Sequence, residues 1–236
     1  MAKKVIRFLS DTEDRLLGIF FLLVLIVGLY GVYDTLIIYR DAIETGMLKF
    51  RQVYAQEEEE KEIKGFVAAW ISVDGTSIDF PVMQGPDNSE YLNKNPYGEY
   101  SLSGSIFLDY RNSPGFTDSY NLIYGHHMEG GMMFGALDSF LDQKYLEKHR
   151  SGTVEVDGKE YPLTLFAAFQ TQAGESRIFN PEDESADAKL GFIKKEAWTA
   201  ADPPESTEGI RLVVLTTCTS PESFDRTILA GYIPAP

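Results

Sequence analysis

An uncharged apolar run near the N-terminus constrains this chain more than any other feature. Leu16 to Tyr33 (LLGIFFLLVLIVGLYGVY) holds eighteen residues without a charged side chain, and apolar character continues through Thr35 to Tyr39. At ~1.5 Å per residue, a helix of eighteen residues spans about 27 Å, close to the thickness of the hydrocarbon core of a bilayer. A run that is apolar on every side predicts a transmembrane helix over residues 16–39, not a helix packed inside a globular domain.

Basic residues before the run predict its orientation. They are Lys3, Lys4, Arg7 and Arg15. Because positive charge is typical of the cytoplasmic side, we expect residues 1–15 in the cytoplasm and the remainder outside a cell membrane that the chain crosses once. A cleaved signal peptide is the alternative. Its candidate cleavage pattern, Val53-Tyr54-Ala55, lies about twenty residues beyond the run, which is too far for a signal peptidase site.

Residues 40–64 are predicted to form a helical stalk or linker. Within Arg40–Gln56, apolar residues recur three or four positions apart, at Ile43, Met47, Phe50 and Tyr54. One apolar stripe at this spacing is typical of a helix that docks on a domain. The glutamates at 57–60 form a like-charge run, which is typical of solvated chain. The globular domain is therefore expected at residues 65–236.

The pattern from Gly65 onward is typical of a mostly β fold. Asp74-Gly75 and Asp157-Gly158 each separate two apolar runs and predict tight hairpins. The expected strands cover residues 66–73, 76–83, 105–109, 121–126, 153–156 and 159–171 and two C-terminal runs, which makes eight, as in a closed or sandwich-like β fold. Two helices are expected between them, Met133–Tyr145 and Asp187–Ala200, with Asp187 as the N-cap of the second.

Charge and missing motifs exclude several function classes. The net charge of −15 argues against a nucleic-acid partner, which favours a basic surface. The sequence contains no glycine-rich phosphate loop, no zinc-type Cys/His array and no EF-hand loop. We therefore expect neither a cofactor nor a bound metal.

The C-terminal segment Arg211–Ile233 (RLVVLTTCTSPESFDRTILAGYI) carries the candidate chemistry. Two apolar runs, both predicted strands, flank the turn-forming residues Ser220–Ser223. Cys218, the only cysteine of the chain, ends the first run, and Arg226 begins the second. A small buried thiol is the alternative for Cys218. Neighbouring threonines and Arg226 favour instead the polar, electropositive surroundings that a reactive thiol needs.

A thiol nucleophile is commonly paired with a histidine base, and the chain has three histidines. His149 lies in EKHR after an amphipathic stretch, which is typical of a solvated helix end. His126 follows the apolar strand Leu122-Ile123-Tyr124 and Gly125, so it stands at a strand end, as Cys218 does. The alternatives for His126 are a metal pair with His127, for which no acidic or sulfur ligand is suitably spaced, and a structural histidine.

Three motifs, in this order, resemble the signature segments of class B sortases. They are GSIFLDYRN at 104–112, IYGHHM at 123–128 with MFG at 133–135, and LTTC at 215–218 followed by Arg226. The resemblance covers the chain from about Arg40 to the C-terminus. The preceding membrane span and the helix before the cysteine strand agree with it. Val214, where the family usually has threonine, is a departure expected to affect strand packing more than chemistry.

The resemblance implies an extracellular cysteine transpeptidase on an eight-stranded sortase-type β-barrel with peripheral helices. By position, it makes Cys218 the nucleophile, His126 the acid and base, and Arg226 the third catalytic residue. The substrates would be secreted proteins with a C-terminal sorting signal, which is cleaved after threonine. The acceptor would be an amine of a peptidoglycan precursor in a Gram-positive cell wall.

Three further residues flank the catalytic positions. We expect Tyr124, Thr216 and Thr217 to line the peptide groove. The resemblance implies that the Asp187–Ala200 helix and the loop Thr171–Glu184 form its other wall. Three alternatives remain open. Water could be the acceptor, which makes the chain a cysteine peptidase, or a substrate lysine could be, as in a pilin-polymerising sortase. The chain could also be an anchored binding module with an inert cysteine.

Overall fold

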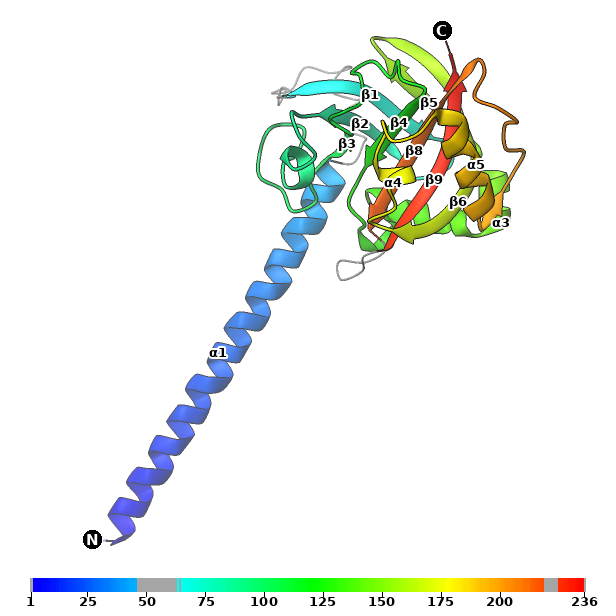
Figure 1. Cartoon of the computed structure of the whole chain (residues 1–236). Coiled ribbons are helices and arrows are strands. Elements are labelled where there is room, and N and C mark those ends of the chain that lie inside the picture. Colours follow the sequence, from blue (N-terminus) through cyan, green and yellow to red (C-terminus); the bar gives the residue numbers. More distant parts are fainter. Residues whose placement is uncertain (1, 46–62, 64, 219–224, 236) are drawn as a thin grey trace. The chain divides into compact units, whose positions relative to one another are not determined.

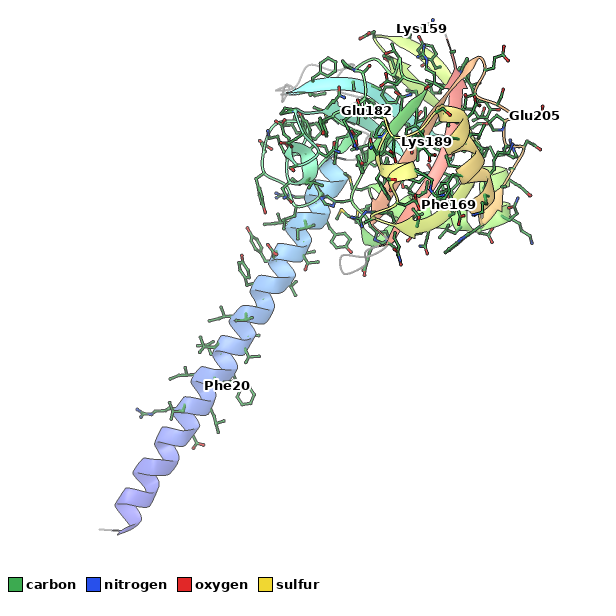
Figure 2. The ribbon with its side chains drawn as sticks, viewed as in Figure 1. Phe20, Lys159, Phe169, Glu182, Lys189 and Glu205 are labelled. Atoms are coloured by element: carbon green, nitrogen blue, oxygen red, sulfur yellow. The ribbon has the colours of Figure 1, made fainter. Side chains whose placement is uncertain are left out.

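One long helix contains the apolar run. This computed structural model describes residues 2–45, 63, 65–218 and 225–235. Helix α1 (Ala2–Thr45) includes Asp14–Arg40, a stretch long and apolar enough to cross a membrane. The large apolar side chains from Leu16 to Leu36 are exposed, and Phe20 projects from the helix in Figure 2. The predicted stalk beyond Thr45 and the glutamate run lie outside the described residues.

The described part of the chain after α1 forms a compact unit built on one β-sheet. Its strands are β1 (Phe66–Val73), β2 (Asp79–Gln84), β3 (Ile106–Leu108), β4 (Tyr120–Tyr124), β5 (Ser151–Val156), β6 (Lys159–Gln172), β7 (Thr199–Ala200), β8 (Ile210–Cys218) and β9 (Asp225–Pro234). Across the described residues their order is β5-β1-β2-β3-β4-β8-β9-β6-β7. Because β5 also pairs with β6, the first eight strands in this order close into a barrel, and β7 adds only a short pairing to β6. The predicted eight-stranded barrel is confirmed (Figure 1).

Strand β8 is apolar on both faces because both faces are covered. Val213 and Leu215 belong to the barrel core, a cluster that draws residues from every barrel strand. Leu212 and Val214 point the other way, into a second cluster. Alternate residues of a strand face opposite sides, so a continuous apolar run is the pattern of a strand buried twice.

The described residues form six short helices after α1. They are η1 (Glu90–Leu92), η2 (Glu129–Gly131), η3 (Phe134–Leu141), α3 (Gln143–Lys148), α4 (Ser176–Phe179) and α5 (Ala186–Glu196). Apolar residues of η3, such as Phe134 and Leu137, pack in the barrel core. Ile178 of α4 and Leu190 of α5 pack in the second cluster, over the outer face of β8 and β9 (Figure 1).

The prediction of one helix over Met133–Tyr145 is wrong, because this stretch belongs to two helices, η3 and α3. Asp142 separates η3 from α3 with an extended backbone, φ −90° and ψ 124°. Its side chain accepts a hydrogen bond from the amide of Tyr145 at 2.9 Å. An aspartate in this role begins a new helix, and its non-helical backbone ends the previous one.

The predicted helix Asp187–Ala200 is correct in place and wrong at both ends. Ser185, not Asp187, is the N-cap, and its hydroxyl accepts from the amide of Ala188. The helix ends at Glu196, and residues 199–200 form β7 instead. Trp198, which falls within the predicted helix, is 61% exposed because it lies beyond the end of α5.

Two glycines offer a matched test of packing around this fold. A Cβ on Gly135, in η3, would press on the carbonyl oxygen of Met128, whereas a Cβ on Gly191, in α5, has nothing within 4 Å. We expect Gly135→Ala to lower the free energy of unfolding by about 1–3 kcal/mol. Gly191→Ala should raise it by about 0.5–1 kcal/mol, because alanine is the better helix former. Denaturant unfolding followed by tryptophan fluorescence measures both, and shifts of the same sign would contradict the packing described.

Candidate functional site

Strands β4 and β8 run parallel and end at the same edge of the barrel. Tyr124 pairs with Thr216, and the amide of Gly125 donates to the carbonyl of Thr216 at 3.1 Å. His126 lies two residues beyond Tyr124, and Cys218 lies two residues beyond Thr216. The parallel register therefore carries the backbones of His126 and Cys218 out at the same edge.

Strands β8 and β9 are antiparallel, and Cys218 and Arg226 form the last pair of their ladder. Directly opposite residues of such a ladder have Cα atoms about 4.5–5.5 Å apart. The Nη1 atom of Arg226 donates to the carbonyl of Asp225 at 3.3 Å. The side chain of Cys218 and the predicted turn Ser220–Ser223 lie outside the described residues. The backbone nevertheless brings the positions of the predicted nucleophile and guanidinium together.

The imidazole of His126 contacts a backbone group that the sequence did not reveal. Its Nε2 lies 2.6 Å from the carbonyl oxygen of Leu92, the last residue of η1. A carbonyl oxygen only accepts, so Nε2 carries the hydrogen in this contact. In the neutral ring, Nδ1 is then the atom without a proton and the one able to take one. The two residues are 34 positions apart, and no local pattern connects them.

The other two histidines have different surroundings. Nε2 of His127 lies 2.8 Å from Oδ2 of Asp138, in η3. His149 is the C-cap of α3, as its predicted place at a helix end requires, and its Nδ1 contacts the carbonyl of Asp74 at 3.1 Å. Among the residues that the structure describes, no group of three or more His, Cys, Asp or Glu side chains could hold a metal ion.

Tyr124 is fixed by a buried carboxylate. Its hydroxyl donates to Oδ2 of Asp109 at 3.0 Å, and its ring stacks on Phe107 with the ring centroids 5.3 Å apart. Asp109 is fully buried and forms an ion pair with Arg111 at 2.7 Å. Burial acts to raise the pKa of Asp109, but hydrogen bonds from Arg111 and Asn88 outweigh it, so this pKa lies below its ordinary value. The carboxylate therefore stays charged and keeps accepting from Tyr124.

The three predicted groove residues differ in exposure. Tyr124 is half-buried, whereas Thr216 and Thr217 are buried. Of these three, Tyr124 alone has side-chain surface that a peptide at this edge could contact. The role of all three in substrate binding stays a prediction.

Two cations fix the segment that follows β6. Arg111 donates to the carbonyl of Phe179 at 2.6 Å and to Oδ1 of Asn180 at 3.0 Å. Lys189 of α5, labelled in Figure 2, is fully buried and donates to the carbonyls of Arg177 at 2.9 Å and Asn180 at 2.7 Å. Burial lowers the pKa of Lys189. Its place among the apolar positions of α5 was the one signal in the sequence that it is buried.

Comparison with known sequences identifies the family. A family model described as a sortase domain matches residues 71–233. Two relatives named Sortase B are 31% identical over 162 residues (Listeria monocytogenes) and 32% identical over 170 residues (Staphylococcus aureus). The matches cover 68% and 70% of this chain, and 65% and 68% of those relatives' own lengths.

Solved structures agree with this assignment. A Streptococcus pyogenes class B sortase involved in pilus biogenesis, Spy0129, is 39% identical with a TM-score of 0.67, and the match covers 79% of this chain and 98% of that one. Sortase B from the type II pilus of Streptococcus pneumoniae is 34% identical with a TM-score of 0.60, covering 72% and 93%. A Staphylococcus aureus sortase B–substrate complex is 26% identical with a TM-score of 0.67, covering 87% and 98%. The chain belongs to the sortase family, and its relatives place it among the class B sortases.

Proposed function

We propose that this chain is a membrane-anchored cysteine transpeptidase, which cleaves the C-terminal sorting signal of a secreted protein after threonine and joins that protein to an amine. The observation that carries the proposal is the pairing of Cys218 with Arg226 at the end of β8 and β9, beside the end of β4 that leads to His126. Family membership supports the reaction class. The strand ends support the assignment of roles to these three residues.

The proposed reaction has two steps. The Cys218 thiolate attacks the threonine carbonyl carbon, and the C–N bond breaks while the departing amine takes a proton from His126, leaving a thioacyl enzyme. The incoming amine then attacks the thioester, gives a proton to His126 and expels the thiolate. Arg226 stabilises the oxyanion of each tetrahedral intermediate, because its charge is permanent and its donors lie in one plane.

The contact with Leu92 supports a specific proton path. Because Nε2 of His126 donates to the Leu92 carbonyl, the proton exchanged with substrate is expected to move through Nδ1. The backbone of η1 would then orient the ring, as a carboxylate or amide side chain does in other cysteine enzymes.

The groove is proposed to lie between this edge and the segment after β6. Tyr124 would contact the peptide, while the buried Thr216 and Thr217 would form the floor beneath it. The loop Thr171–Glu184 and α5 would form the other wall. Hydrogen bonds from Arg111 and Lys189 hold this wall in place, so that it would be ordered before a peptide binds.

Membrane attachment and domain boundaries follow from the N-terminal helix. We propose residues 1–15 in the cytoplasm, 16–39 in the membrane, 40–64 as a stalk and 65–236 as the extracellular catalytic domain. The support is the apolar stretch Asp14–Arg40 together with the basic residues before it. The enzyme would then face wall precursors tethered to the same membrane.

The acceptor is proposed to be an amine of a peptidoglycan precursor, and a specific observation favours a second candidate, a lysine of a pilin subunit. The two pilus-associated relatives are 39% and 34% identical to this chain. In the same comparison with solved structures, those of Staphylococcus aureus sortase B are 26% and 27% identical, although the sequence match to the Staphylococcus aureus relative is 32%.

Removing the thiol should abolish the reaction without unfolding the domain. We expect Cys218→Ala to form no thioacyl adduct with a sorting-type peptide, because no other cysteine exists in the chain. Intact-protein mass spectrometry of the full chain in detergent measures the adduct. If a thiol-reactive probe labels Cys218 neither in the native chain nor in the His126→Ala variant, the inert binding module becomes the better account.

Replacing the guanidinium by an ammonium should impair the reaction strongly. We expect Arg226→Lys to lower the acylation rate about a hundredfold, or ~3 kcal/mol of barrier, because lysine cannot reproduce the planar fork. Arg150→Lys is the matched control, since Arg150 forms an ion pair with the exposed Asp202 away from these strand ends. Near-normal rates in the Arg226→Lys chain would refute an oxyanion role for the guanidinium.

The acceptor can be identified from products. With a sorting-type peptide we expect ligation to an added amine to exceed hydrolysis, as determined by mass spectrometry with and without triglycine or a lysine-containing peptide. Preference for the side-chain amine of lysine would support pilin polymerisation, and preference for the α-amine would support wall attachment. Hydrolysis that is unaffected by either amine would indicate a peptidase.

A further inference from the structure

A carboxylate below the strand ends joins two of the segments that carry the proposed catalytic residues. Asp138, in η3, accepts from Nε2 of His127 through Oδ2 at 2.8 Å. Its other oxygen, Oδ1, accepts from the hydroxyl of Thr227 at 2.8 Å. Both oxygens of one side chain are therefore used, each by a different strand end.

Each partner is the neighbour of a proposed catalytic residue. His127 follows His126, and the carbonyl of His126 accepts from the amide of Phe134 at 3.1 Å, at the start of η3. Thr227 follows Arg226 in β9 and pairs across the ladder with Thr217, the residue before Cys218. The carboxylate of Asp138 therefore contacts the residues that directly follow two of the three proposed catalytic residues, His126 and Arg226.

The contact lies on the inner side of β9. Successive residues of a strand point to opposite faces, so Thr227 points away from the face of Arg226. Thr227 is fully buried, and its hydroxyl also accepts from Nε2 of Gln170 at 3.3 Å. A hydroxyl that donates its one hydrogen to Asp138 and accepts from Gln170 is held in one orientation.

We propose that Asp138 is a positioning residue for the transpeptidation proposed above, through its simultaneous hydrogen bonds to His127 and Thr227. It sets the separation between the segment of His126 and the strand of Arg226. Catalysis depends on such separations, because misplacing a reacting group by ~1 Å costs up to about a hundredfold in rate. The inference rests on the proposed function, whereas the hydrogen bonds do not.

A carboxylate suits this place for a chemical reason. Two partners that both donate need two acceptor oxygens, and an ionised aspartate offers them. Asparagine has the same shape but one oxygen, so it can accept from His127 or from Thr227 and presents an NH₂ group to the other. Asp138→Asn therefore tests the second acceptor with almost no change in volume.

The first test separates positioning from binding. In the full chain in detergent, we expect Asp138→Asn and Thr227→Val each to lower kcat about tenfold with KM changed less than about twofold, because the peptide groove is untouched. Thr227→Ser retains the hydroxyl and should restore most of the rate. The double variant should lose little more than either single variant, because both remove the same contact.

The matched control is Asp202→Asn, the same change at an aspartate that pairs with Arg150 at 2.6 Å. It should leave kcat within about twofold of the native chain, as surface pairs contribute little. Thermal unfolding of every variant, recorded beside the kinetics, shows whether a lower rate reflects unfolded protein. If Asp138→Asn fails to fold, the Thr227→Val and Thr227→Ser pair decides.

A second measurement is independent of the proposed function. The rate of Cys218 alkylation by iodoacetamide, without peptide, reports the surroundings of the thiol. We expect this rate to fall in Asp138→Asn and Thr227→Val and to stay constant in Asp202→Asn. A native chain that transfers no peptide but shows this pattern would refute the transpeptidase and retain the positioning network. The role of Asp138 would be overturned if the native chain transfers peptide but Asp138→Asn and Thr227→Val have the same kcat and the same alkylation rate as Asp202→Asn.

Discussion

The ladder between β8 and β9 is the constraint on which the rest of the structure depends. It runs without a register shift from Ile210 opposite Pro234 to Cys218 opposite Arg226. An antiparallel register cannot slip by one residue without turning every side chain to the other face. Because both faces of these strands are packed, the apolar pattern over the nine pairs fixes the register, and the register places Cys218 opposite Arg226 in the last pair.

The two covered faces contribute differently to the site. The inner face holds η3 against the barrel, and η3 places Asp138 between His127 and Thr227. The outer face carries α4 and α5, and there the half-buried Arg111 and the buried Lys189 bind backbone carbonyls. Removing one partner of a buried charge is far costlier than breaking a surface pair, so these contacts hold their segments strongly. The strand ends are therefore supported from inside and outside the barrel.

Local sequence predicted much of this fold because its signals are local. The apolar run from Leu16 predicted the long helix, and Asp74-Gly75 and Asp157-Gly158 predicted the hairpins of a barrel whose eight strands are confirmed. Helix boundaries were less accurate. Met133–Tyr145 read as one amphipathic helix because apolar residues continue past Asp142, and only the cap formed by that side chain divides it. Ser185 and Asp187 are both good N-caps by residue type, but Ser185 caps the helix, whereas Asp187 lies in its first turn and accepts from the amide and the hydroxyl of Thr207.

By itself, the sequence determined which residue types could perform thiol chemistry, and its resemblance to the family's motifs predicted roles for His126, Cys218 and Arg226. The sequence also predicted that each of these residues lies at the end of a β-strand, because the apolar pattern of a strand is visible in neighbouring residues. Only the tertiary structure decided that His126 contacts the carbonyl of Leu92 and that the buried Lys189 donates to backbone carbonyls. The same holds for the hydrogen bonds by which Asp138 connects His127 to Thr227. These contacts connect residues up to 89 positions apart, and they depend on how the barrel closes, which no local spacing encodes.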